Sequence, residues 1–121
     1  EAVLEVQDYA KSLLRPGVVL KEYEGQVEQF MGEKLRALGL IKNIEHEDVR
    51  RFYPHATSHF MGLTVHDAGD YTQPLMPGMV LTVEPGIYIP DEAIGVRIED
   101  DVLITEDGIA VLSERLPRIL R

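Results

Sequence analysis

The sequence contains no cysteine, which excludes disulfides, thiolate metal ligands and a cysteine nucleophile. Long apolar runs are missing as well, since no stretch approaches the roughly 20 apolar residues of a membrane-spanning helix. The first residues do not show the basic start and apolar run of a secretory signal. Together these absences lead us to expect a cytoplasmic protein.

Clusters of lysine and arginine are also absent. The chain has 21 acidic and 12 basic residues, giving a formal net charge of −9. A nucleic-acid-binding protein normally presents a basic face, and an anionic membrane surface would repel this chain. We therefore expect neither nucleic acid nor a membrane as a partner. Most of the acidic surplus should be solvated surface, with a few carboxylates held for cations.

The length and composition indicate a single domain over residues 1–121, and the start of the chain leads us to expect that this domain is partial. Hydrophobic residues make up 45% of the chain, which is enough for a packed core. The chain begins at Glu1 without methionine, and Ala2 and Val3 are already in helical register without a capping residue before them. This start predicts a piece of a longer protein.

Apolar residues recur at three- and four-residue steps in the first third of the chain. This spacing predicts one helix over residues 2–14, ending before Pro16 and Gly17, and a second from about Leu20 to Leu38. Residues 41–53 are polar and predict no element.

Glycine, proline and histidine interrupt the stretch from Pro54 to Gly78, which indicates loops and short strands around a site. Alternating residues then predict strands over 79–83, 87–89 and 95–104, and a hairpin to 109–112. Helices followed by antiparallel strands indicate an α+β fold.

Two glutamates stand in strand-like surroundings. Glu84 ends an apolar strand before Pro85, and Glu99 lies between β-branched neighbours. A partly buried carboxylate must be paired or must coordinate a metal. Glu99 is thus either a metal ligand or a salt-bridge partner of Arg97, and Glu84 either a ligand or a carboxylate beside a turn.

Three histidines, His55, His59 and His66, lie in the loop-rich stretch. The spacing of His55 and His59 would suit one helix face, but Pro54 argues against a helix there. Each is either functional or an ordinary structural or exposed histidine. A histidine and two carboxylates suit Mn²⁺, Zn²⁺ or Co²⁺, so the residues alone predict an acidic domain with a carboxylate-rich metal site.

Three motifs in order carry a more specific signal. They are His55-x₃-His59-x₂-Gly62-Leu63-x-Val65-His66-Asp67, Pro77-Gly78-Met79-Val80-Leu81-Thr82-Val83-Glu84-Pro85-Gly86-Ile87-Tyr88 and Gly95-Val96-Arg97-Ile98-Glu99-Asp100-Asp101. This set resembles the Xaa-Pro aminopeptidase and prolidase branch of the pita-bread metallopeptidases. The resemblance implies the C-terminal half of that fold, with two helices followed by an antiparallel sheet.

The resemblance also implies roles for individual residues. His59, Glu84 and Glu99 would be ligands of a site for two divalent ions, most typically Mn²⁺ with Zn²⁺ or Co²⁺ as alternatives. Glu84 would also move a proton, and His66 would stabilise the tetrahedral intermediate. His55 and Arg97 would line the pocket for a peptide with proline at its second position, with His55 also among the catalytic groups.

The family pattern needs more than this chain holds. It includes two aspartate ligands and a further histidine from an earlier segment, so the resemblance implies that the N-terminal half of the domain is a missing partner. We expect the isolated chain to be inactive unless a partner chain supplies those carboxylates, and a homo-oligomer would fit the family. The alternatives are a prolidase acting on dipeptides and a non-catalytic peptide-binding module of the same fold.

Overall fold

The computed structural model describes residues 1–61 and 72–113. In these ranges the elements follow the order α1 (Ala2–Leu13), α2 (Leu20–Ala37), α3 (His46–Phe52), β1 (Phe60–Met61), β2 (Val80–Val83), β3 (Gly86–Ile89), the 3₁₀ turn η1 (Pro90–Glu92), β4 (Ile94–Arg97), β5 (Asp100–Ile104) and β6 (Ile109–Val111). The α+β class predicted from the sequence is confirmed.

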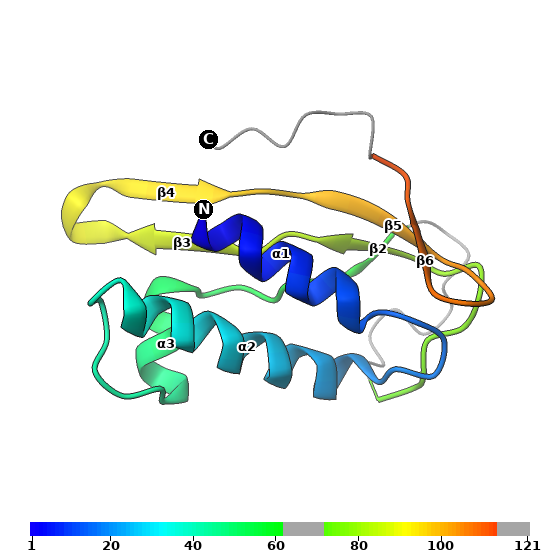
Figure 1. Cartoon of the computed structure of the whole chain (residues 1–121), viewed down its shortest axis with the longest axis horizontal. Coiled ribbons are helices and arrows are strands. Elements are labelled where there is room, and N and C mark those ends of the chain that lie inside the picture. Colours follow the sequence, from blue (N-terminus) through cyan, green and yellow to red (C-terminus); the bar gives the residue numbers. More distant parts are fainter. Residues whose placement is uncertain (62–71, 114–121) are drawn as a thin grey trace.

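Two antiparallel sheets run end to end along the molecule. One has the strand order β1-β2-β5-β6, and the other is the hairpin of β3 and β4. Since β3 continues the path of β2 and β5 that of β4, the two sheets form one long ribbon with α1 and α2 lying against it (Figure 1). No helix within the described ranges is long and apolar enough to cross a membrane.

The predicted apolar stripes of α1 and α2 form the core with the strands. The buried side chains include Val6 and Ala10 from α1, Val27 and Met31 from α2, and Leu81 from β2. Burying a Val, Leu or Met side chain of this kind stabilises the fold by about 1.5–3 kcal/mol. The two helices therefore fix the sheet by hydrophobic packing on its helix side.

The third helix, α3, was not predicted. Only Val49 and Phe52 are buried in its seven residues, and the charged residues between them mask any apolar period. Tyr53 ends the helix in a non-helical conformation, in keeping with the bias that the following Pro54 imposes on the residue before it.

The strand predicted over residues 95–104 is interrupted. Val83 pairs with Asp100 and Gly86 pairs with Arg97, so Glu84 and Pro85 lie opposite a matching gap in the other strand. Pro85 has no N–H to donate to the pairing of the two strands. Its carbonyl still accepts a hydrogen bond at 3.3 Å from the N–H of Ile98, which lies in the opposite gap. Because this donor is missing, the regular pairing of the two strands is interrupted at the same point in both.

The opposite gap consists of Ile98 and Glu99. The break therefore sets Glu84 and Glu99 across from each other in the middle of the ribbon. Strand pairing resumes after the break at Gly86. Only glycine fits there without a shift, because a Cβ atom would lie 2.9 Å from the carbonyl oxygen of Val96.

A buried glutamine supports this break from the helix side. The Nε2 atom of Gln7 donates to the carbonyls of Val83 at 3.3 Å and Ile98 at 3.4 Å. These carbonyls belong to the residues immediately before Glu84 and Glu99. Helix α1 thus joins the two backbone segments from which the predicted ligands project.

Candidate metal centre

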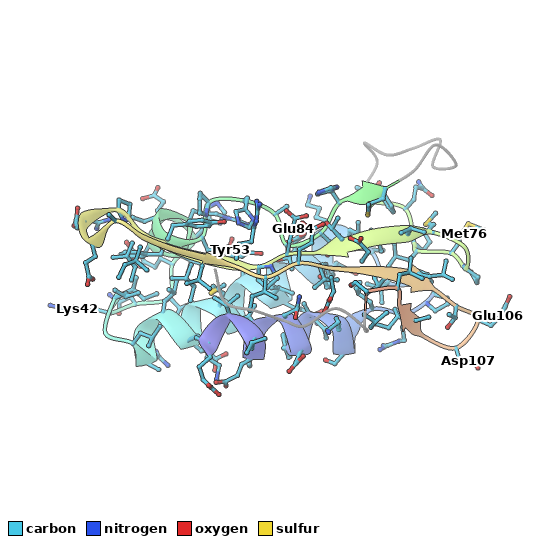
Figure 2. The ribbon with its side chains drawn as sticks, turned by 90° about the horizontal axis from the view of Figure 1, so that it is seen from above. Lys42, Tyr53, Met76, Glu84, Glu106 and Asp107 are labelled. Carbon is cyan, nitrogen blue, oxygen red and sulfur yellow. The ribbon has the colours of Figure 1, made fainter. Side chains whose placement is uncertain are left out.

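Glu84 is the centre of the candidate site. Its Oε2 lies 3.0 Å from Nε2 of His59, and its Oε1 lies 3.9 Å from Nη1 of Arg97. The Glu84 side chain is 12% exposed, whereas those of His59 and Arg97 are 55% and 54% exposed. Figure 2 shows Glu84 near the middle of the ribbon. Its carboxylate lies at the base of the site, because the side chains of His59 and Arg97 beside it are much more exposed.

Glu99 projects from the opposite gap and is exposed, so the burial predicted from its alternating neighbours is wrong. The reason is the break itself, which takes this residue out of the strand. Although the residue as a whole is exposed, desolvation of the part that lies against the protein raises the pKa of Glu99, and the negative charges of Glu84 and Asp101 raise this pKa further. The negative charges of Glu84 and Asp101 thus both act on the carboxylate of Glu99.

Asp101 adds a feature that sequence reasoning missed. Among the described residues, its Oδ1 is a buried side-chain atom without a hydrogen-bond partner. A buried, unpaired carboxylate oxygen is costly unless a cation or donor satisfies it. In the sequence, Asp101 stands at the end of the third motif, and nothing there assigns it a role.

Oxygen donors from Glu84, Glu99 and Asp101 with a nitrogen from His59 form a donor set that suits hard or borderline divalent ions. The orphaned oxygen of Asp101 and the two negative charges that act on Glu99 fit the same interpretation. Within the described residues, however, no three such side chains converge on one point that could hold an ion. The structure brings His59 and Glu84 into contact and leaves Glu99 beside them.

His55 lies apart from this group. Its Nδ1 lies 2.9 Å from the carbonyl of Ala56, and its Nε2 lies 3.0 Å from the hydroxyl of Tyr88. The Ala56 carbonyl can only accept, so Nδ1 carries a proton and, in the neutral ring, Nε2 accepts from Tyr88. Its ring also meets the edge of Tyr53 with centroids 5.2 Å apart. The third predicted histidine of the loop region, His66, lies outside the described residues.

The backbone before β1 is bonded to β2, and these bonds place His59. The N–H of Glu84 donates to the carbonyl of Thr57 at 2.7 Å, and the N–H of Thr82 donates to the carbonyl of His59 at 2.9 Å. The N–H of His59 donates in turn to Oγ1 of Thr82 at 3.1 Å. Contact between His59 and Glu84 is therefore a consequence of strand pairing.

Comparison with known proteins gives the family. The model of metallopeptidase family M24 matches residues 1–106. Human Xaa-Pro aminopeptidase 3 is 41% identical over 133 residues, covering 98% of this chain and 26% of the human protein. The Escherichia coli Xaa-Pro aminopeptidase is 43% identical over 125 residues, covering 89% of this chain and 28% of that protein.

Solved structures agree with the sequence match. The Pseudomonas aeruginosa aminopeptidase PepP superposes with a TM-score of 0.86 at 36% identity, covering 98% of this chain and 31% of that one. Escherichia coli aminopeptidase P gives a TM-score of 0.84 at 38% identity, with coverage of 98% and 31%. The fold is therefore that of the C-terminal part of the pita-bread metallopeptidases, as the sequence predicted.

The chain belongs to metallopeptidase family M24, and its similarity lies with the Xaa-Pro aminopeptidases of that family. It spans about a quarter of the length of the curated relatives that it matches.

Proposed function

We propose that this chain supplies one half of the active site of a metal-dependent aminopeptidase that releases the residue before proline. The observation that supports this most is the contact of His59 with Glu84, opposite Glu99 at the shared strand break. Relatives named Xaa-Pro aminopeptidase match almost the whole chain, which favours this activity over that of a prolidase. The presence of all three ligand residues argues against a non-catalytic module.

The proposed ligands are His59, Glu84 and Glu99, which would hold two divalent ions together with ligands from outside this chain. When bound, such ions lower the pKa of a shared water and polarise the carbonyl of the peptide bond. Mn²⁺ is our first choice and Zn²⁺ or Co²⁺ the alternatives. A zinc-substituted form of the Escherichia coli enzyme has been solved with product, which supports divalent metal use.

Glu84 is suited to move the proton in this scheme. Its carboxylate is mostly buried, lies next to His59 and Arg97, and is held at the end of β2 by the hydrogen bond from its own N–H to Thr57. A general base must be fixed within hydrogen-bond reach of its proton, and positioned acid–base groups contribute about 10²–10⁴-fold in rate. Glu84 would accept a proton from the attacking water and pass it to the leaving nitrogen.

The remaining residues would bind the peptide. Arg97 is half exposed above Glu84 and is free to contact a peptide carbonyl. His55 faces Tyr88 and Tyr53, and these rings would form one wall of a pocket for proline. A proline amide has no N–H, so the shape of such a pocket would set selectivity. His66 would stabilise the tetrahedral intermediate.

The other ligands would come from an N-terminal half of the same domain, or from a partner chain in a homo-oligomer. The test uses the complete protein that carries this chain, with Mn²⁺ and three substrates: an Xaa-Pro-Xaa tripeptide, an Xaa-Pro dipeptide and an Xaa-Ala-Xaa tripeptide. We expect cleavage of the first alone. Cleavage of the dipeptide alone would favour a prolidase, and cleavage of none would contradict the proposal.

The isolated 121-residue chain gives the complementary test. We expect it to be inactive as a verified monomer, because the two aspartate ligands that the family pattern requires are not among its residues. Strong tripeptide hydrolysis by that monomer would refute the half-site proposal while leaving the peptidase activity intact.

A further inference from the structure

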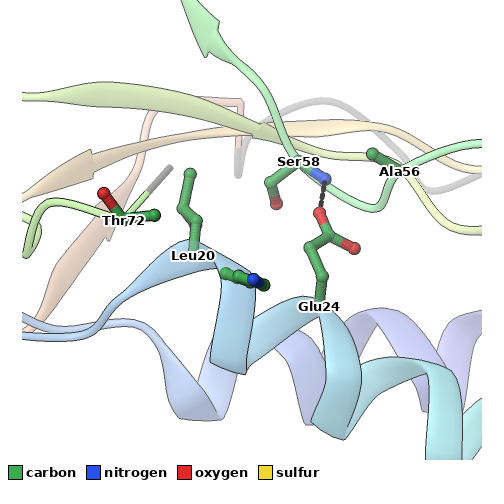
Figure 3. A pocket seen from close by; sticks show the side chains of 6 residues that line it. Leu20, Glu24, Ala56, Ser58 and Thr72 are labelled. Atoms are coloured by element: carbon green, nitrogen blue, oxygen red, sulfur yellow. Dashed lines mark hydrogen bonds between the residues drawn. The ribbon is translucent and has the colours of Figure 1, made fainter. Parts of the chain in front are cut away.

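Glu24, a glutamate outside all of the motifs, is hydrogen bonded to the backbone segment that carries His59. Glu24 lies in α2, and its Oε1 accepts a hydrogen bond from the N–H of Thr57 at 2.9 Å. Its Oε2 accepts from the N–H of Ser58, also at 2.9 Å. Figure 3 shows Glu24 rising from α2 towards this segment, with the bond to Ser58 drawn as a dashed line.

The geometry of these two hydrogen bonds is specific. Each carboxylate oxygen accepts from a different one of two consecutive amides, so the orientation of both peptide planes is fixed. Hydrogen bonds to an ionised group are shorter and roughly twice as strong as neutral ones. Glu24 and Ser58 also line a pocket of about 300 Å³ between α2 and the segment (Figure 3). The carboxylate therefore lies at the boundary between the helix layer and the candidate site.

The opposite edge of the same segment is bonded to the site. The carbonyl of Thr57 accepts from the N–H of Glu84 at 2.7 Å, and that of His59 accepts from Thr82 at 2.9 Å. The segment thus lies between Glu24 on one side and β2 on the other. Any shift of the Thr57 and Ser58 amides would be passed to both His59 and Glu84.

Two tyrosine hydroxyls reinforce the segment but do not replace the carboxylate. Tyr23 is hydrogen bonded to Oγ of Ser58 at 2.7 Å, and Tyr53 to Oγ1 of Thr57. Both bonds reach side chains, whereas Glu24 binds the backbone N–H groups. Without an acceptor, these part-buried N–H groups would lose their bonds, so the backbone conformation depends on Glu24.

We propose that Glu24 is a positioning residue, which holds residues 57–59 in the conformation that lets His59 and Glu84 face the same ions. This inference rests on the proposed function, because it takes both side chains to be ligands. It makes α2, which contributes no ligand, responsible for the alignment of two of them. Supporting groups of this kind typically change metal affinity or activity by about 10–100-fold when removed.

The test compares three variants of the complete protein. Glu24→Gln keeps the size but replaces one acceptor oxygen with an NH₂ donor, and Glu24→Asp keeps the charge on a shorter stem. Glu22→Gln is the matched control, since Glu22 is exposed on the same helix. Hydrogen exchange over residues 55–60 is measured without metal, followed by the Kd for Mn²⁺ and by kcat and KM for the tripeptide.

We expect Glu24→Gln to speed exchange at Thr57 and Ser58 about tenfold or more, since a bond to a charged group is lost. The Kd for Mn²⁺ should rise about 10–100-fold, with KM unchanged and kcat restored by excess Mn²⁺. Glu24→Asp should give intermediate values, so the series stays informative if Glu24→Gln folds poorly. Glu22→Gln should match the unaltered protein.

Two results would overturn the proposal. Unchanged exchange in Glu24→Gln would show that the carboxylate does not hold the segment. Faster exchange with an unchanged Kd for Mn²⁺ and unchanged kcat would show that the hold does not position the ligands. Failure of the unaltered protein to bind Mn²⁺ is a separate result, which would refute the proposed function and leave Glu24 no ligand to position.

Discussion

Nε2 of His59 lies 3.0 Å from Oε2 of Glu84, although the two residues are 25 positions apart in the chain. The pair occupies the donor atoms that an ion would need. An ion bound by both side chains would replace their direct contact without moving the two groups far apart, because two ligands about 2.1 Å from one ion lie about 3 Å from each other.

The first prediction concerns His59 itself. His59→Ala removes one proposed ligand, and we expect the Kd of the complete protein for Mn²⁺, measured by calorimetric titration, to rise by more than the roughly 10–100-fold that loss of a supporting group costs. His46→Ala is the matched control, because His46 is exposed and is hydrogen bonded to Glu28 away from the strand break. Equal affinities of the two variants would remove His59 from the ligand set.

The second prediction tests the support from α1. Gln7→Glu replaces the buried donor with an acceptor that faces the carbonyls of Val83 and Ile98. We expect the free energy of unfolding to fall by about 1–3 kcal/mol, since buried acceptors are left without their donor. Urea unfolding of the metal-free protein measures this change. Gln26→Glu, an exposed change on α2, should have little effect, and an equal loss in both variants would contradict the role of Gln7.

The third prediction concerns the glycine at the strand break. In Gly86→Ala the new Cβ would lie 2.9 Å from the carbonyl oxygen of Val96 and from the hydroxyl of Tyr88. We expect a loss of about 1–3 kcal/mol in the free energy of unfolding from this overpacking. Gly25→Ala is the control, because nothing lies within 4 Å of its Cβ, and in a helix it should stabilise by about 0.5–1 kcal/mol. An unchanged free energy of unfolding in Gly86→Ala would contradict this prediction, because it would mean that the backbone at the strand break moves to make room for the methyl group.

The fourth prediction concerns alkaline pH. Burial raises the pKa of Tyr23 and of Tyr53 well above the usual tyrosine value of about 10. Above that pH the unfolded chain loses these protons while the folded chain keeps them, so the unfolded state binds fewer protons and stability falls. We expect no contribution below about pH 10 and a loss of about 1.4 kcal/mol per pH unit per tyrosine above it.

Urea unfolding at several pH values checks this slope. Tyr23→Phe should remove about half of it, while Tyr9→Phe, a change in a partly exposed residue stacked on Phe30, should leave it unchanged. A slope that is the same in Tyr23→Phe as in the unaltered chain would contradict the assignment.

Sequence reasoning predicted the parts of the fold that have a local period. The stripes of α1 and α2 and the turn between β5 and β6 were predicted within a residue or two. The short helix α3 was missed because Val49 and Phe52 alone are buried in it. The gap at Ile98 and Glu99 was missed because its cause, Pro85, lies on the other strand.

The candidate site shows the same division. The motifs named His59, Glu84 and Glu99 through a family resemblance, whereas their spacing alone left them undecided. The orphaned oxygen of Asp101 has no local signal, because only the folded chain buries it. The hydrogen bonds from the segment before β1 to Glu24 likewise have no local sequence signal, because they depend on the packing of α2 against that segment. The role of His66 remains a prediction from the motif.

The most direct test of the account is the effect of Glu84→Gln on tripeptide hydrolysis by the complete protein with saturating Mn²⁺. We predict a fall of about 10²–10⁴-fold in kcat, because the variant removes the proton carrier and a ligand, while Glu92→Gln in the exposed turn η1 keeps full activity. Full activity in Glu84→Gln would contradict the central claim that the pair of His59 and Glu84 is the core of a peptidase metal site.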